Sequence, residues 1–220
     1  MHFPSLLLAF LAPAQAIAPG ERVALPAPVI TGGMPLMDAL AARRSTRDFT
    51  DAPIPDQVLS DLLWAAWGVN RPDGHRTAPS AMNDQEIDLY LVRADGAWRY
   101  DAKDHALVLV TAQDLRREAG HQPFVWKAPL NLVYVADHGR MHKVARDLQD
   151  LYAAADAGFI GQNVYLYCAS VGLGSVVRAW LDRDALAGRL GLGEDQTVLL
   201  SQTVGWPAKP SEAGATPEAP

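Results

Sequence analysis

The sequence predicts an α+β fold, and three observations lead to that expectation. The chain has 220 residues, of which 49% are hydrophobic and 20% charged, which suits one domain with a sizeable core. Strand-like and helix-like patterns follow one another irregularly, without the regular βαβ series of a parallel sheet. One helical pattern, over residues 145–172, is much longer than the others. We therefore expect a single domain of mixed helices and strands, over residues 36–210.

The first part of the chain predicts helices and loops. Residues 17–35 are rich in proline and glycine and predict an extended lead-in. A short helical pattern covers residues 36–42, and a second runs from about residue 56 to 67 with apolar side chains at helical spacing. The polar stretch 70–85 predicts a loop that is long enough for a functional role.

The middle of the chain predicts a sheet. Residues 86–93 and 97–101 predict a hairpin joined through Ala94, Asp95 and Gly96. The apolar run 105–110 is compatible with a strand or a loop, and residues 111–119 predict a small helix. Residues 129–137 predict a buried strand.

The long helical pattern over 145–172 is crowded with alanine and glycine, which lets neighbouring elements approach closely. Polar Asp156, Gln162 and Asn163 interrupt it, so it is not a membrane span. A glycine-rich turn at 172–175, a short helix near 182–190, a strand over 196–206 and a flexible tail over 211–220 complete the expectation.

Charge and cysteine content narrow the classes of function. A net charge of −6 argues against broad nucleic-acid binding, which requires an excess of basic residues. Cys168 is the single cysteine, so no intrachain disulfide forms, and its apolar surroundings predict a small buried side chain. His138 and His142 share a spacing of four but lack a third ligand, so we expect no metal site.

The N-terminus has the pattern expected of an export signal. An apolar run ends at Ala14-Gln15-Ala16, the small-residue pattern of signal-peptidase cleavage, which predicts a signal peptide over residues 1–16. The usual basic start is missing, and a misassigned start codon or an apolar tail packed on the domain is the alternative. A cleaved chain would be periplasmic or secreted, with no other segment to hold it in a membrane; an uncleaved chain would be cytoplasmic.

A cluster of arginines is the first candidate site. Arg43, Arg44, Ser45 and Arg47 follow directly on a predicted helix end. Guanidinium forks, a hydroxyl and free backbone N–H groups are what a phosphate monoester needs. The alternative is a solvated charge run that pairs with surface carboxylates such as Asp48 and Asp51.

Three further stretches are weaker signals. Ser80, Asn83 and Gln85 offer uncharged donors and acceptors that suit the edge of a heteroaromatic ring, although an ordinary polar turn has the same composition. The glycines of 172–175 suit a tight helix exit with exposed N–H groups, and a simple helix C-cap explains them equally well. Lys209 lies just beyond the last predicted strand.

Together these motifs resemble the FMN-dependent nitroreductase family, and most closely the branch that includes the SagB-type dehydrogenases. They are R-R-S-x-R-x-F near the start, P-S-x-x-N-x-Q before a strand, an Ala/Gly-rich helix running into G-L-G-S, and a late G-W-P. The resemblance covers residues 36–210. It implies a nitroreductase-like fold with a central mixed or antiparallel sheet flanked by helices. It also implies a homodimer with the long central helix at the interface.

The resemblance also assigns the candidate residues to FMN. It places Arg43, Arg44, Ser45 and Arg47 at the phosphate and ribityl chain, with Arg47 beside the flavin edge where negative charge accumulates. The loop with Pro79, Ser80, Asn83 and Gln85 would face the isoalloxazine. Backbone N–H groups at Leu173, Gly174 and Ser175 would lie near flavin N5 and O4, and Lys209 would touch the phosphate. No side chain is assigned as a catalytic acid or nucleophile.

The implied function is that of an FMN-dependent oxidoreductase with a ping-pong scheme. It would reduce nitroaromatic or quinone-like acceptors, or dehydrogenate a small or peptide substrate, with NAD(P)H as a donor if the protein meets a nicotinamide pool. Phe124 and Trp126 are candidates for lining the flavin face, although core packing is favoured. The alternative is a degenerate member that binds flavin or another phosphorylated ligand without turnover; a polyanion-binding surface protein fits the charge poorly.

Overall fold

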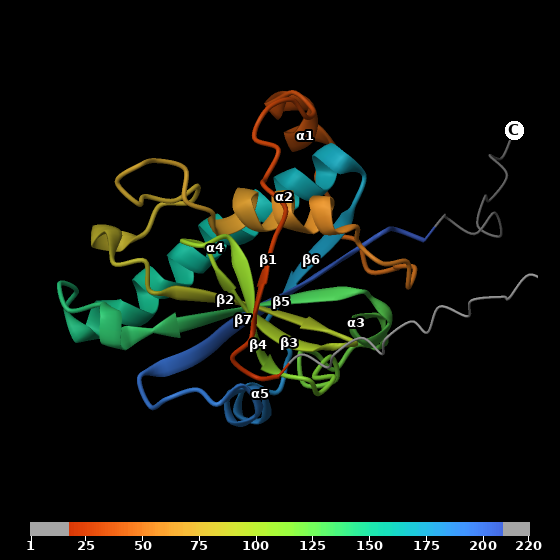
Figure 1. The fold of residues 1–220 in the computed structure, drawn as a ribbon. Coiled ribbons are helices and arrows are strands. Elements are labelled where there is room, and N and C mark those ends of the chain that lie inside the picture. The colour runs from red at the N-terminus through yellow and green to blue at the C-terminus, as the bar shows by residue number, and fades with distance from the viewer. Residues whose placement is uncertain (1–17, 209–220) are drawn as a thin grey trace, which may run out of the picture.

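The computed structural model describes residues 18–208, which form one antiparallel sheet with helices on both of its faces (Figure 1). The sheet has seven strands in the order β1-β4-β3-β2-β5-β7-β6, and every neighbouring pair is antiparallel. The strands are β1 (Arg22–Ala24), β2 (Ile87–Arg93), β3 (Gly96–Asp101), β4 (Ala106–Thr111), β5 (Leu130–Asp137), β6 (Gly174–Arg178) and β7 (Gln196–Gly205).

Helices enclose this sheet as two layers. Figure 1 shows α1, α2 and α4 on one side of the sheet and α5 on the other. The helices are α1 (Leu36–Ala42), α2 (Asp56–Trp67), α3 (Pro123–Lys127), α4 (Arg146–Val171) and α5 (Arg183–Leu190), with 3₁₀ turns η1 (Ala81–Asn83) and η2 (His138–Arg140). The α+β class and the antiparallel form of the sheet are confirmed. None of these helices is long and apolar enough to cross a membrane.

Alternating side chains on the central strands supply both layers of the core. In β2, Leu89 and Leu91 join the apolar cluster beneath α2 and α4, whereas Tyr90 and Val92 join the cluster beneath α5. Successive side chains of a strand point to opposite faces. A strand covered by helices on both faces is therefore apolar at almost every position.

Small residues let α4 lie close to the sheet, as the sequence predicts. A Cβ atom on Gly161 would lie 3.3 Å from Oε1 of Gln202 on β7, and the Gln202 amide donates to the Gly161 carbonyl at 3.2 Å. The helix ends at Gly172, whose φ of 79° is left-handed and whose N–H donates to the Cys168 carbonyl. Glycine meets that conformation without strain.

The expected helix over 111–119 and the expected turn over 172–175 are wrong, and the open choice between strand and loop for 105–110 is resolved. Thr111 ends strand β4, and residues 112–119 form bends and a turn, because Asp114 accepts from the Arg116 N–H and also pairs with its guanidinium. A side chain that satisfies the backbone locally competes with a helix. The run 105–110 is strand β4, and the supposed turn at 172–175 already begins strand β6 at Gly174.

Burial of α4 against the sheet gives a direct test of the core. Replacing Ile160, which is 0% exposed, with alanine should lower the free energy of unfolding by about 2–5 kcal/mol, because a cavity remains. Ile30 is 62% exposed, so Ile30→Ala is a matched control that should change stability by less than about 0.5 kcal/mol. Urea unfolding followed by circular dichroism measures both, and equal losses would contradict this packing.

Candidate functional site

The arginine-rich segment 43–47 is held against the first residues of β6. Arg43 caps α1, with its N–H donating to the Ala39 carbonyl. The chain then runs beside β6, where Ser45 bridges Ser175 and the Thr46 N–H donates to the Ser175 carbonyl at 2.9 Å. The first and third sequence motifs therefore meet, although about 130 residues separate them along the chain. We call residues 43–47 the arginine loop.

A close backbone approach makes this contact possible. A Cβ atom on Gly174 would lie 2.8 Å from Cβ and Cγ2 of Thr46, a distance at which one of the two segments has to move. A residue without a side chain is therefore required at position 174, because the arginine loop lies so close. Gly174 is also the first residue of β6.

Positive charge on the arginine loop is not neutralised by the rest of the protein. Within residues 18–208, no carboxylate oxygen lies within 4 Å of the Arg43, Arg44 or Arg47 side chains. The alternative of pairing with Asp48 and Asp51 is therefore not realised. Three arginines within five residues, without a carboxylate partner, form a local positive charge that attracts an anion.

Tyr165, on α4, fixes the base of the arginine loop. The Arg43 guanidinium lies 5.3 Å from the centre of its ring, and its hydroxyl lies 3.1 Å from the Ser45 Oγ. The same hydroxyl accepts from the Val177 N–H on β6 at 2.9 Å. Sequence reasoning missed Tyr165, because nothing distinguishes it from the other aromatic residues of α4.

A pocket of about 120 Å³ opens beside the loop. Arg44, Thr46, Tyr165, Leu173 and Ser175 contribute to its lining. Its volume lies well below the roughly 300–1,000 Å³ of pockets that enclose a whole organic ligand. In a single chain, this pocket therefore suits a small anionic group at one end of a larger molecule.

The Pro79–Gln85 loop is shaped by its own polar side chains. Ser80 Oγ accepts from the Gln85 N–H at 3.1 Å, and Asn83 Oδ1 accepts from the Gln85 amide at 3.1 Å. Met82, Asn83 and Gln85 have φ values of 53°, 56° and 50°, a region that side chains enter only when the surroundings compensate for the strain. The Pro79–Gln85 loop therefore has a defined conformation that its own side chains hold in place.

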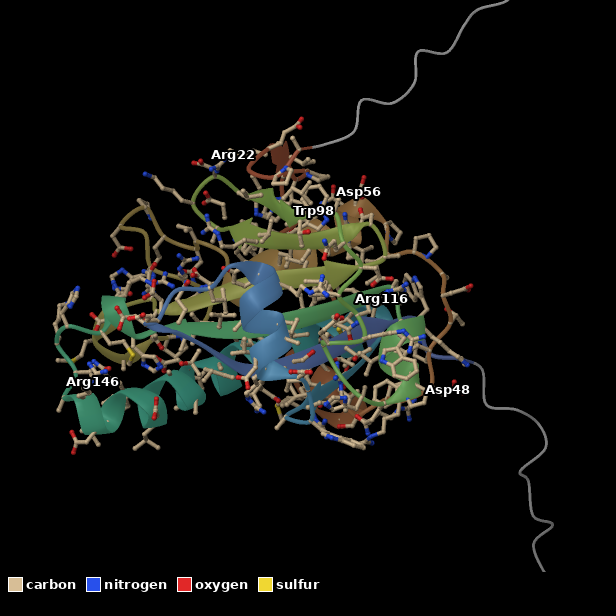
Figure 2. The ribbon with its side chains drawn as sticks, turned by 90° about the horizontal axis from the view of Figure 1, so that it is seen from below. Arg22, Asp48, Asp56, Trp98, Arg116 and Arg146 are labelled. Atoms are coloured by element: carbon tan, nitrogen blue, oxygen red, sulfur yellow. The ribbon has the colours of Figure 1, made fainter. Side chains whose placement is uncertain are left out.

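The two candidate regions lie far apart in one chain. The Ala81 N–H donates to Asp156 in the first half of α4, whereas the arginine loop lies beside Gly172 and Leu173 at the end of that helix. From Asp156, the contacts of the arginine loop on α4 lie nine positions away at Tyr165 and sixteen at Gly172, which corresponds to about 14–24 Å. Figure 2 likewise shows Asp48, next to the arginine loop, on the opposite side of the molecule from Arg146 at the start of α4.

Several other predicted residues have structural roles or lie outside the described part. Phe124 packs on Phe49 with ring centres 6.0 Å apart, and the Trp126 indole donates to the Gly120 carbonyl at 2.8 Å, so both serve mainly in packing. Cys168 is buried, and burial raises the pKa of its thiol. Lys209 and the expected signal peptide at 1–16 lie outside residues 18–208.

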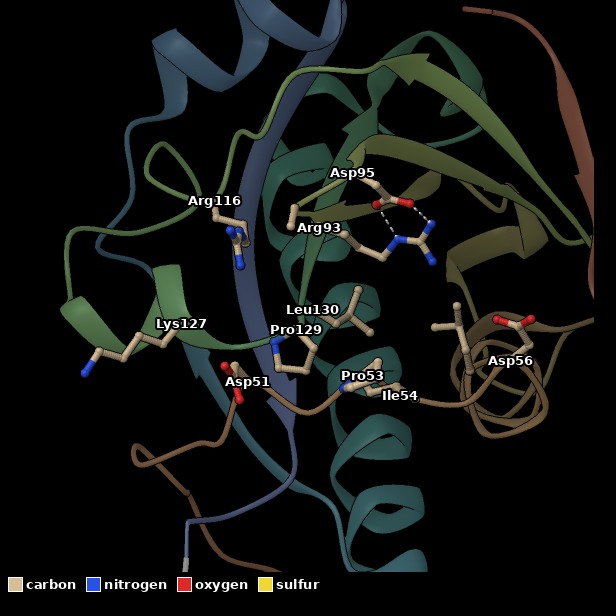
Figure 3. A pocket seen from close by; sticks show the side chains of 12 residues that line it. Asp51, Pro53, Ile54, Asp56, Arg93, Asp95, Arg116, Lys127, Pro129 and Leu130 are labelled. Carbon is tan, nitrogen blue, oxygen red and sulfur yellow. Dashed lines mark hydrogen bonds and ion pairs between the residues drawn. The ribbon is translucent and has the colours of Figure 1, made fainter. Parts of the chain in front are cut away.

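A larger pocket of about 560 Å³ lies beside the start of β5 (Figure 3). Pro53, Ile54 and Leu130 contribute apolar surface to it. Its arginines are already neutralised: Arg93 pairs with Asp95 at 2.6 Å, and Arg116 pairs with Asp114 at 2.7 Å. This pocket therefore has less attraction for an anion than the arginine loop has.

Comparison with known proteins agrees with the fold and with the motifs. The nitroreductase family model matches residues 40–206, and the chain belongs to the nitroreductase family. A protein of Ralstonia eutropha JMP134, provisionally described as a nitroreductase, is 48% identical with a TM-score of 0.83, over 94% of this chain and 100% of that one. Assignment to the branch with the SagB-type dehydrogenases stays a prediction.

Two curated relatives are more distant. A Methanocaldococcus jannaschii protein, also provisionally described as a nitroreductase, is 32% identical over 160 residues, which cover 68% of this chain and 81% of the relative. The NADPH-flavin oxidoreductase of Vibrio harveyi is 29% identical over 183 residues, which cover 78% of this chain and 65% of that protein. These relatives support an oxidoreductase with flavin-related chemistry.

The contact between Gly174 and Thr46 can be tested by adding one methyl group. Gly174→Ala should lower the free energy of unfolding by about 1–3 kcal/mol, because the new Cβ displaces the arginine loop. A Cβ atom on Gly188, in α5, would meet nothing within 4 Å, so Gly188→Ala should instead stabilise the protein by about 0.5–1 kcal/mol. Urea titrations that show the same sign for both variants would contradict the close approach.

Proposed function

We propose that this protein binds FMN and is an FMN-dependent oxidoreductase. The observation that carries the proposal is the arginine loop, whose three guanidinium groups have no carboxylate partner within residues 18–208. Membership of the nitroreductase family and a flavin oxidoreductase among the relatives support the choice of ligand.

The residues of the arginine loop fit a phosphate group. Arg44 and Ser175 line the small pocket, and the Ser45 hydroxyl is exposed beside them. Arginine presents paired N–H donors that match phosphate oxygens. A dianionic phosphate would supply the counter-charge that the protein itself does not provide.

The Pro79–Gln85 loop would reach the cofactor from a second copy of the chain. The two candidate regions are separated by about 14–24 Å along α4, and we propose a homodimer in which each site uses the arginine loop of one subunit and the Pro79–Gln85 loop of the other. Exposed apolar side chains on the two helices nearest the site favour association. Met37 on α1 is 72% exposed, and Leu151 on α4 is 62% exposed.

This chain would contribute to catalysis by binding the cofactor and by placing positive charge near it. Bound FMN would supply hydride and electron transfer at its N5 position. Arg47 would place positive charge near the part of the flavin that becomes negative on reduction, which favours the reduced form. The Leu173 N–H already donates to the Cys168 carbonyl at 2.9 Å, so Gly174 and Ser175 are the proposed backbone contacts to the ring. We assign no side chain as a general acid or nucleophile.

The proposal also includes the electron donor and the electron acceptor. We propose NAD(P)H as a donor and nitroaromatic or quinone-like molecules as acceptors, with dehydrogenation of a small or peptide substrate as the other direction. An exported chain would meet a different reductant. Removal of the 1–16 segment, and with it a periplasmic or extracellular location, remains a proposal.

Removing one arginine should separate cofactor binding from folding. Arg44→Ala should weaken FMN affinity by at least about tenfold, because a charge-assisted bond to phosphate contributes about 1.5–3 kcal/mol. Arg189 lies on α5, across the sheet from the arginine loop, and bonds Gln113, so Arg189→Ala should leave the affinity unchanged. Quenching of flavin fluorescence measures each dissociation constant.

Two outcomes would change the conclusion. A colourless protein that takes up no FMN at micromolar concentration would contradict the proposal. Yellow protein that dithionite bleaches, but that transfers no electrons from NAD(P)H to a quinone or a nitroaromatic compound, would indicate a flavin-binding member without turnover.

A further inference from the structure

Two acidic side chains meet in the interior beside the Pro79–Gln85 loop. Glu86 directly precedes β2 and is 0% exposed, and Asp156 on α4 is 3% exposed. Asp156 Oδ2 accepts from the Ala81 N–H at 2.7 Å. Burial raises the pKa of the Glu86 carboxyl, and Asp156 is the side chain that raises it further, through its charge and a side-chain hydrogen bond, whereas the Glu86 backbone N–H acts in the opposite direction. Neither Glu86 oxygen receives a hydrogen bond from any other residue in the described part of the chain.

Nearby cations do not neutralise this pair. Arg140 on η2 donates to the backbone carbonyls of Gln85 and Glu86, at 3.0 and 2.7 Å. Its guanidinium also pairs with Asp88 at 3.0 Å and Asp137 at 3.2 Å. It therefore lies close enough to influence Glu86 but bonds other groups.

The loop itself adds one further ion pair. Lys143 lies 3.1 Å from Asp84 Oδ1 and is largely exposed. Neither the loop, β2, η2 nor the start of β5 thus supplies a donor to the Glu86 carboxyl. Two carboxylates in contact, shielded from water and without a bonded cation, do not both stay ionised.

The repulsion between the two carboxylates is relieved when they share one proton. Burial raises the pKa of Glu86 to about 7, and the neighbouring Asp156 adds to the rise, while the Glu86 backbone N–H and Arg140 oppose it. Neutral Glu86 is then a donor, and its O–H donates to the Asp156 carboxylate. Asp156 in this way receives two hydrogen bonds, one from Glu86 and one from the Ala81 N–H, and it links β2, the loop and α4.

We propose that Glu86 and Asp156 form a proton-dependent latch that holds the Pro79–Gln85 loop on α4. With the proton present, the loop is fixed at Ala81. With the proton lost, the two carboxylates repel each other, and the segment from Ala81 to Glu86 separates more readily from the helix. Glu86 and Asp156 are positioning residues, and neither is assigned a contact with substrate.

The direction of the pH effect follows from linkage. In the open loop, an exposed Glu86 titrates near the ordinary glutamate value of about 4.5, whereas in the closed loop its pKa is about 7. The closed form therefore binds the extra proton. Its advantage is complete below about pH 4.5, is lost as the pH rises to about 7, and then stays at its low value.

Hydrogen exchange at a single amide tests the latch in the protein without flavin. The protection factor of the Ala81 amide should fall more than tenfold between pH 5 and pH 7.5 in the wild type. Glu86→Gln replaces the shared proton with an amide N–H, so its protection factor should fall less than threefold. The Val133 amide, in the centre of β5, reports global unfolding in the same experiment.

Two further variants complete the test. Asp156→Asn replaces the other carboxyl group with an amide and should also reduce the pH dependence of the Ala81 protection factor. The test can therefore still be made if one of the two variants fails to fold. Exposed Glu194 precedes β7, and Glu194→Gln should behave like the wild type. A flat wild-type profile, or an equal fall in Glu86→Gln, would overturn the latch.

A second arm connects the latch to the cofactor, and this connection rests on the proposed function. FMN affinity should decrease between pH 5 and pH 7.5 in the wild type more than in Glu86→Gln. If Ala81 exchange shows the latch and FMN does not bind at any pH, the proposed function fails and the latch stands. If FMN binds and Ala81 protection is flat, the latch alone fails.

Discussion

The pairing of the arginine loop with β6 is the contact on which the rest of the site depends. It aligns Thr46 with Ser175 and requires a residue without a side chain at Gly174. Because β6 is an edge strand of the sheet, it has a free side on which the loop is received. The sheet thereby fixes the backbone that carries three arginines, whose like charges repel one another and would be offset by an anionic ligand.

Helix α4 organises both candidate regions through single polar residues. Tyr165 fixes the arginine loop near one end, and Asp156 fixes the Pro79–Gln85 loop nearer the other. One rigid helix therefore sets the distance between them, and a symmetric pair of chains would bring unlike ends together. In this arrangement, the proton held between Glu86 and Asp156 would act on one half of each site.

Sequence reasoning succeeded where the signal is local and periodic. The helical spacing in 56–67, the alanine-rich run of α4 and the alternation in β2 each depend on neighbours within a few residues, and the fold class followed from them. It failed for 111–119, where Asp114 binds Arg116 locally, and for β6, whose glycines suggested a turn. Tyr165 was not singled out, and Asp156 was interpreted only as a polar interruption of the helix, because their partners lie 120 and 75 residues away.

Comparison of FMN with riboflavin tests most directly whether the arginine loop holds a phosphate, since the two ligands differ in that group alone. We expect the protein to bind FMN at least about a hundredfold more tightly than riboflavin, as two charge-assisted bonds would provide, and we expect Arg44→Ala to reduce that ratio. Equal affinities for the two ligands in isothermal titration would contradict the assignment.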